Sequence, residues 1–340
     1  MKERIALWDN LKFVLITLVV VGHFADVFTN VSDTCKSIFA FIYAFHMPLF
    51  LFLNGLFYKS ADILRKCLFY ISAGYLLKIV SAVIIYFCGS RMSFSLLSDA
   101  GMPWYMFVFA MCTAITYLLR NQNKGYILFF SILLACVVGY DQSIGDFLYL
   151  SRLIVFFPFF YLGTMINPQK IVEFKQKYIW WLFPLAMILL VGWAYLCYAK
   201  LDDIYVLRHL FTGRNPFNLE LITYGAVERL LCYAIAVFIG FALIILVPTR
   251  RIACVTSMGK NTLNVYFWHW NVYVLFNRFF GISQLFYQGI LGKISFLLIG
   301  VVMTVVLSQK YVFSFPLKQI KNAIFNEGKK VLVENINGAS

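Results

Sequence analysis

The sequence predicts an all-α, polytopic integral membrane protein with about ten transmembrane helices, N-in and C-in. Of its 340 residues, 62% are hydrophobic and only 13% are charged, whereas a soluble domain carries about a quarter charged residues. The hydrophobic residues gather in runs, such as residues 11–28 and 290–313, that match the roughly 20 apolar residues needed to cross a bilayer. These runs are helices, because a backbone in lipid must satisfy its own hydrogen bonds and the alternating polarity of a barrel is missing.

Ten apolar runs follow one another along the chain, separated by polar or turn-forming segments. In order, they are residues 11–28, 38–58, 67–88, 104–119, 126–139, 152–166, 179–198, 225–247, 261–280 and 290–313. The fifth and sixth are short for a span, so we expect them to tilt, to lie at the interface or to extend beyond the run itself. Together the runs predict a single transmembrane domain over residues 1–313 and a cytoplasmic C-terminal tail over residues 314–340.

The first run also has the length of a signal peptide. It contains His23 and Asp26, has no Ala-x-Ala cleavage site and is followed by further spans. We therefore expect it to stay uncleaved as the first helix.

The positions of Lys and Arg predict how the chain is oriented. With the N-terminus in the cytoplasm, the inside segments hold roughly twice as many Lys and Arg residues as the outside segments, as the positive-inside rule requires. A wrong number of spans would have placed basic loops on alternating sides. Ten helices with both termini inside therefore agree with the charges, and we expect a multi-pass protein of the cell (inner or cytoplasmic) membrane.

Charge and cysteine content exclude several other classes of protein. The net charge of +14 is spread between the apolar runs and forms no single basic face, which argues against a nucleic-acid partner. The eight cysteines are scattered, with no CxxC pair, which argues against a metal site or a disulfide framework. We expect no bound cofactor and no metal.

The longest polar segment between runs is 199–224, which this orientation places outside. It holds Asp202, Asp203, Arg208, His209, Arg214, Asn215 and Glu220. The segment is either a solvated connector or a rim that holds a substrate on the outer side, since functional groups concentrate on loops.

Three of the four histidines lie inside apolar runs, where an ionisable side chain is costly and is a candidate for function. Counted along each helix from its inner end, His23, His46 and His269 lie about 12–18 Å into the membrane. A single buried histidine is more often a hydrogen-bonded packing residue. Three at a similar depth favour a shared site, most strongly for His23.

The first run adds a polar face of its own. Lys12 precedes His23 by about three helical turns and Asp26 follows it by three residues, so the three side chains share one face. A carboxylate beside an imidazole fixes its tautomer and supports its action as a general base. The alternative for Asp26 is a polar residue at the outer membrane surface.

Short motifs along the chain resemble those of a known family. They are Asp9-Asn10-Leu11-Lys12 with Val19-Val20-Val21-Gly22-His23, Phe45-His46-Met47-Pro48-Leu49-Phe50 with Leu53-Asn54-Gly55, Pro103-Trp104-Tyr105-Met106, residues 156–163, and Gly259-Lys260-Asn261-Thr262-Leu263 leading to His269. In this order they resemble the membrane-bound acyltransferase family 3, and more closely its fucose 4-O-acetylase-like branch.

This resemblance implies about ten helices and an O-acyltransferase, most often an O-acetyltransferase. It implies transfer from cytoplasmic acyl-CoA, such as acetyl-CoA, to a sugar hydroxyl of a cell-surface glycan or its lipid-linked precursor. It also implies that His23 is essential and that the basic residue eleven positions earlier assists it. Here that residue is Lys12, where many relatives carry Arg, and bidentate binding is thereby lost. Asn54 stands where many relatives carry Ser, and Arg65-Lys66 lacks the Arg-x-x-Arg form.

The residues and the resemblance together give a candidate site. His23 is the candidate base, helped by Asp26 or His46, with an acyl-histidine intermediate as the alternative. The candidate substrate-binding residues are Lys12, Arg65 and Lys66 for the CoA phosphates, together with Trp104 and His269.

Two other classes of protein fit a polytopic chain with polar groups at mid-membrane. A transporter or flippase of an envelope glycan or small molecule usually shows internal repeats, and the histidine-containing motifs here are unlike one another. A structural subunit of an envelope complex has no need of buried histidines. The acyltransferase hypothesis uses these side chains without requiring internal repeats, and it is favoured chiefly by the resemblance.

Overall fold

The computed structural model describes residues 4–91, 94–98, 101–309 and 313–325. Over these residues the fold is all-α, apart from one isolated β-bridge between Ser98 and Phe147. The helices are α1 (Ala6–Val27), α2 (Asp33–Tyr43), α3 (His46–Leu56), α4 (Ile63–Phe87), α5 (Trp104–Leu118), α6 (Lys124–Val137), α7 (Leu150–Met165), α8 (Pro168–Ala199), α9 (Leu201–Val206), α10 (Arg208–Phe211), α11 (Gly225–Leu246), α12 (Ala253–Met258), α13 (Thr262–Phe280), α14 (Ile282–Leu285) and α15 (Gly289–Leu307), with a 3-10 turn at Val138–Tyr140.

Each of the ten predicted apolar runs falls on one helix or, for 38–58, on two, which confirms the all-α prediction for the described residues. Residues 310–312 of the last run lie outside the described part. Six candidate spans are long and apolar enough to cross a membrane. They are α1, α2 together with α3, α4, α8, α11 and α15, and α5, α6 and α7 are shorter apolar helices. The chain is thus a multi-pass membrane protein by length and composition. The count of ten crossings, the orientation and the domain boundary at residue 313 stay predictions, and residues 326–340 of the predicted tail lie outside the described part.

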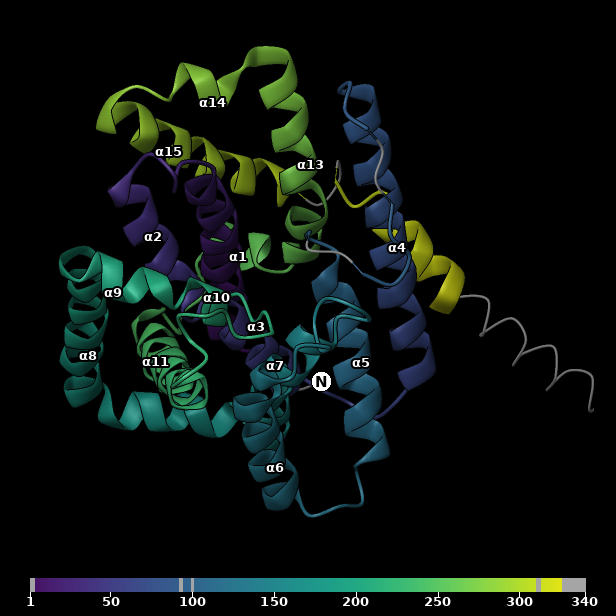
Figure 1. The fold of residues 1–340 in the computed structure, drawn as a ribbon. Helices are drawn as coiled ribbons and strands as arrows, with labels where there is room; N and C mark the ends of the chain where they lie inside the picture. Colours follow the sequence, from purple (N-terminus) through teal and green to yellow (C-terminus); the bar gives the residue numbers. More distant parts are fainter. Residues whose placement is uncertain (1–3, 92–93, 99–100, 310–312, 326–340) are drawn as a thin grey trace, which may run out of the picture.

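The first helix lies at the centre of the bundle. α1 contacts α2, α3, α12, α13 and α15, and Figure 1 shows it in purple between α2 and α13. Leu7, Leu11, Leu15 and Phe24 on this helix are completely buried. The hydrophobic face of α1 is therefore part of the protein core. Because this packing fixes the helix, it also fixes the positions of the polar residues that α1 carries.

The second predicted run is interrupted, which the sequence analysis did not anticipate. α2 ends at Tyr43 and α3 begins at His46, and Phe45 between them has φ −136° and ψ −21°. Pro48 lies in the first turn of α3 and has no N–H to donate to a carbonyl one turn earlier, so a continuous helix would lose a hydrogen bond here. The break places His46 at the first position of a new helix.

Two glycines let α3 and α7 cross in close contact. A β-carbon built on Gly55 would lie 1.8 Å from the carbonyl oxygen of Phe160, and one on Gly163 would lie 2.2 Å from that of Phe52. Both helices border the interior cavity described below, so this crossing sets the distance between two of its walls.

The long helix α8 has an amphipathic start and an apolar remainder. It bends at Tyr178, where the backbone has φ −116° and ψ 19°, and Figure 1 shows the two arms at a steep angle. Beyond the bend, Trp180 and Trp181 are 87% and 81% exposed, and Tyr195 and Tyr198 near the other end are 66% and 75% exposed. Aromatic side chains at both ends of an apolar helix are typical of membrane interfaces.

Candidate functional site

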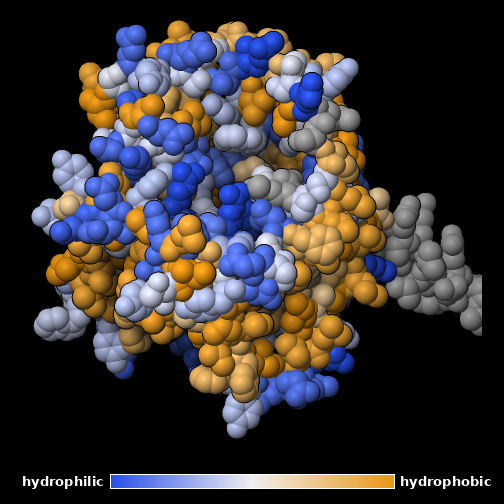
Figure 2. Space-filling view, viewed as in Figure 1, coloured by the Kyte–Doolittle hydropathy of each residue, from blue (hydrophilic) through white to orange (hydrophobic). Residues whose placement is uncertain are grey.

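A cavity with a volume of about 1180 Å³ lies between the helices that carry the predicted site. Its walls come from α1, α2, α3, α4, α5, α7, α9, α10 and α13. Exposed residues of segment 199–224, including Asp202, Asn218 and Glu220, border its mouth. Figure 2 shows hydrophilic residues gathered around a hollow near the middle of this face, with hydrophobic residues beside and below it. The predicted rim therefore does border a cavity.

His23 lines this cavity from the C-terminal half of α1. Its Nδ1 lies 3.0 Å from the hydroxyl oxygen of Tyr43 on α2. Its ring centroid lies 5.5 Å from that of His269 and 5.9 Å from that of Trp270, both on α13. Three helices thus meet at this imidazole.

The other two predicted histidines are each held by a backbone carbonyl four residues earlier in the chain, on α2 for His46 and within α13 for His269. Nδ1 of His46 lies 2.9 Å from the carbonyl oxygen of Ile42, and Nδ1 of His269 lies 2.9 Å from that of Val265. A carbonyl oxygen only accepts, so in both rings Nδ1 carries the proton. His46 lines the cavity and His269 packs behind His23 with no exposed surface. Among the described residues, Nε2 of His269 has no hydrogen-bond partner.

Asp26 lines the cavity but pairs with a residue other than His23. Its Oδ1 accepts a hydrogen bond from Arg208 Nη2 at 2.6 Å and lies 3.4 Å from the Thr29 hydroxyl. The predicted i, i+3 contact with His23 is not among its described hydrogen bonds. The group that meets the His23 ring nitrogen is Tyr43, a residue that the sequence analysis missed.

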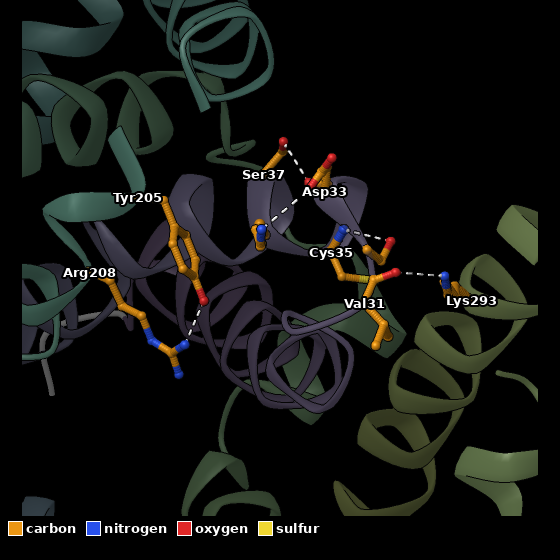
Figure 3. A network of polar contacts seen from close by, with 9 residues as sticks. Val31, Asp33, Cys35, Ser37, Tyr205, Arg208 and Lys293 are labelled. Atoms are coloured by element: carbon orange, nitrogen blue, oxygen red, sulfur yellow. Dashed lines mark hydrogen bonds and ion pairs between the residues drawn. The ribbon is translucent and has the colours of Figure 1, made fainter. Parts of the chain in front are cut away.

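Arg208 connects segment 199–224 to α1 and α2. Its Nη1 donates to the Tyr205 hydroxyl at 2.5 Å, and its guanidinium lies 4.6 Å from the centre of the Phe39 ring on α2. Figure 3 shows Tyr205 and Arg208 beside α2, and also the contact from Lys293 of α15 to the Val31 carbonyl before α2. Segment 199–224 is therefore packed onto α2.

A buried arginine holds the same segment from the other side. Arg229 of α11 has no exposed surface. It donates to the Leu210 carbonyl at 3.1 Å and to Asn215 Oδ1 at 2.8 Å. A charged group is retained at such depth only where hydrogen bonds compensate its lost hydration, so segment 199–224 has a defined conformation at the cavity mouth.

Protonation of His209 should destabilise the folded conformation of segment 199–224. Nε2 of His209 donates to the Pro216 carbonyl at 2.6 Å. Burial lowers the pKa of His209 from its ordinary value, Arg229 and Arg214 lower it further, and the Pro216 hydrogen bond and Asp146 raise it by less. The folded state thus favours the neutral ring. The neutral His209 ring therefore stabilises the folded state at pH values above the pKa that this residue has in the unfolded chain. This stabilisation is lost as the pH falls from that pKa toward the lower pKa of the folded state.

We expect His209→Gln to reduce the acid sensitivity of the protein, because Gln keeps a donor for Pro216 and cannot be protonated. The measurement is thermal unfolding of the purified protein in detergent at about pH 7.5 and about pH 5.5. The wild type should lose more stability between the two than the variant does. Equal losses would contradict this assignment.

Trp104, predicted to bind substrate, also lies in the cavity wall. Its ring stacks on Phe156 of α7, with centroids 5.5 Å apart and planes 24° apart. The Arg152 guanidinium lies 4.9 Å from the centre of the Trp104 ring. Lys78 of α4 lines the same cavity and donates to the carbonyls of Ser95 and Leu96, which fixes that loop beside it.

Lys12, Arg65 and Lys66 lie elsewhere and do not line the cavity. The Lys12 ammonium lies 5.1 Å from the centre of the Phe57 ring, just after α3. Arg65 pairs with Asp62 at 3.7 Å, and Lys66 donates to the Lys59 carbonyl. The contact with Phe57 brings Lys12 to the α3–α4 connection, and Arg65 and Lys66 lie in the first turn of α4 just after it. Lys12 lies about 16 Å along α1 from His23, and the role predicted for the three basic residues stays a prediction.

The described residues contain no group of three or more His, Cys, Asp or Glu side chains placed to hold a metal ion. The cavity wall presents imidazole, phenol, guanidinium, carboxylate and ammonium groups.

Comparison with known proteins gives one match. A family model described as an acyltransferase domain matches residues 5–309, a range that includes every helix from α1 to α15. No curated protein and no solved structure matches the chain.

Proposed function

Because this chain belongs to the acyltransferase domain family, we propose that it is a membrane O-acyltransferase of the fucose 4-O-acetylase type. It moves an acetyl group from acetyl-CoA, or another acyl group from its CoA ester, to a sugar hydroxyl of a cell-surface polysaccharide or its lipid-linked precursor. The observation that carries the proposal is the position of His23, an imidazole on a membrane helix that lines a large cavity with polar and charged side chains in its walls.

In the reaction, Nε2 of His23 removes the proton of the acceptor hydroxyl as the oxygen attacks the thioester carbonyl. The carbon–sulfur bond breaks, and the CoA thiolate leaves and takes up the proton from the imidazolium. An imidazole suits this task because its ordinary pKa lies near neutral pH. The alternative order, in which Nε2 attacks the thioester first and an acyl-histidine then meets the sugar, uses the same side chain.

In this proposal, the two substrates reach His23 from opposite ends of α1. Segment 199–224 borders the cavity mouth, and its polar side chains suit a sugar. Lys12, Arg65 and Lys66 lie toward the other end of α1 and provide positive charge for the CoA phosphates. With ten crossings, N-in and C-in, in the cytoplasmic membrane, the donor comes from the cytoplasm and the acceptor from the outer side.

Deletion of the protein from its host tests this function. The surface polysaccharides of the deletion strain should lack an O-acetyl methyl signal in the proton NMR spectrum, and the wild-type chain supplied in trans should restore it. A glycan that is missing from the surface but fully acetylated inside the cell would favour a transporter instead. An unchanged O-acetyl signal would overturn the proposal.

Lys12→Ala should weaken the use of the donor more than the folding of the protein. Losing a charged contact to phosphate should raise the KM for acetyl-CoA about 10-fold or more. Lys36→Ala is the matched control, because Lys36 pairs with Asp33 on α2, away from this group. An unchanged KM for acetyl-CoA in Lys12→Ala would remove Lys12 from donor binding.

A further inference from the structure

Tyr43 is placed to control which ring nitrogen of His23 carries the proton. It is the last residue of α2 and is 8% exposed. Its ring stacks on Phe39, with centroids 3.7 Å apart and planes 19° apart, and meets the His46 ring edge-on at 4.7 Å. The stacked ring has little freedom, so its hydroxyl is held 3.0 Å from Nδ1 of His23.

The residue before His23 makes this approach possible. A β-carbon built on Gly22 would lie 3.0 Å from Cε2 of Tyr43 and 3.2 Å from Cγ2 of Ile42. Contacts this short would push the Tyr43 ring away from α1. The glycine in the Val21-Gly22-His23 sequence thus has a role beyond helix packing, because it lets α2 bring the phenol to the imidazole.

His23 also differs from its two neighbours in how its ring is held. His46 and His269 each donate Nδ1–H to a backbone carbonyl four residues earlier in the chain, a group that can only accept. The described partner of Nδ1 in His23 is instead the Tyr43 hydroxyl, from another helix. The tautomer of His23 therefore depends on Tyr43, whose oxygen both accepts and donates.

We propose that Tyr43 is the positioning residue of the transfer reaction: it accepts the Nδ1–H of His23 and leaves Nε2 unprotonated toward the cavity. The proposal rests on the function proposed above. When Nε2 takes the proton of the sugar hydroxyl, the Tyr43 oxygen faces the Nδ1–H of the imidazolium and stabilises it. A neutral phenol thereby does what a carboxylate does behind other catalytic histidines, while Asp26 stays paired with Arg208.

Tyr43→Phe tests this directly, because it keeps the stacked ring and removes only the oxygen. The assay uses the purified full-length chain, acetyl-CoA and surface polysaccharide from the deletion strain as acceptor. We expect kcat to fall about 10- to 100-fold, the effect of losing a hydrogen bond to a charged group, with both KM values unchanged. Tyr233→Phe is the matched control, since it removes an equally buried hydroxyl that binds the Val155 carbonyl away from the cavity.

The tautomer is read separately from turnover, by NMR of the chain labelled with 15N-histidine, with the His23 signals assigned by their loss in His23→Asn. The wild type should show a protonated Nδ1 and an unprotonated Nε2 at His23, and Tyr43→Phe should shift the population toward the Nε2–H tautomer. Tyr233→Phe should leave it unchanged. Gly22→Ala, which displaces the ring but keeps the hydroxyl, should lower kcat and shift the tautomer in the same direction.

The possible failures are distinguishable. If the wild type transfers no acetyl group to the polysaccharide, the proposed function fails, and the NMR spectra still decide the role of Tyr43. If the wild type is active and neither Tyr43→Phe nor Gly22→Ala changes the His23 tautomer, the proposal for Tyr43 is overturned and the function stands. A fall in kcat without a change of tautomer overturns it as well.

Discussion

Replacing His23 by alanine is expected to reduce acyl transfer by roughly 10²–10⁴-fold, the usual contribution of a general base. The loss should appear in kcat, because the side chain acts on the proton that moves during the reaction. The measurement is the transfer of radiolabelled acetyl groups from acetyl-CoA to host polysaccharide by the purified variant. In cells, the same variant should accumulate in the membrane and leave the glycan without O-acetyl groups.

The control for His23→Ala is Thr17→Ala, on the same helix. The Thr17 hydroxyl donates to the Phe13 carbonyl within α1, and the side chain does not line the cavity. This variant should transfer acetyl groups at close to the wild-type rate. If His23→Ala were as active as Thr17→Ala, His23 would have no part in the chemistry.

Substituting alanine for Gly55 is expected to destabilise the protein severely. The new β-carbon would meet the Phe160 carbonyl oxygen at 1.8 Å and the Gly163 α-carbon at 3.2 Å. Neither is the end of a flexible side chain, so α3 and α7 must separate. Overpacking of this kind costs about 3 kcal/mol or more. Thermal unfolding in detergent and the yield of protein in the membrane measure the effect.

Gly192→Ala on α8 is the matched control for this substitution. A β-carbon at Gly192 would meet nothing within 4 Å. Alanine favours a helix over glycine by roughly 0.5–1 kcal/mol, so this variant should be as stable as the wild type or slightly more stable. A Gly55→Ala protein with wild-type stability would show that the α3–α7 crossing tolerates a wider spacing.

The helices could be predicted from sequence because the bilayer imposes their length and polarity. Every apolar run predicted from residue 11 onward lies on a helix. The break at Phe45 was missed, since a count of apolar residues treats 38–58 as one run whether or not it is continuous. Pro48 was the available signal, because a proline marks the point where a helix loses a hydrogen bond.

The histidines were likewise predictable, and their partners were not. A fixed rise per residue puts His23 and His269 at similar depth, and the structure places their rings 5.5 Å apart. Spacing along one helix cannot tell which neighbour a side chain chooses. Asp26 is paired with Arg208, 182 residues away in the sequence, and Tyr43 reaches His23 from a different helix.

The exposed aromatic residues on α8 also bear on which lipids suit the protein. Trp180 and Trp181 are separated from Tyr195 and Tyr198 by a helical length of about 20–27 Å, which is shorter than the roughly 30 Å of an average hydrocarbon layer. Hydrophobic mismatch with thicker bilayers would be relieved by local thinning around α8 or by a change in its tilt. The acyl-chain length of the surrounding lipids is therefore a variable to fix before rates from different vesicles are compared.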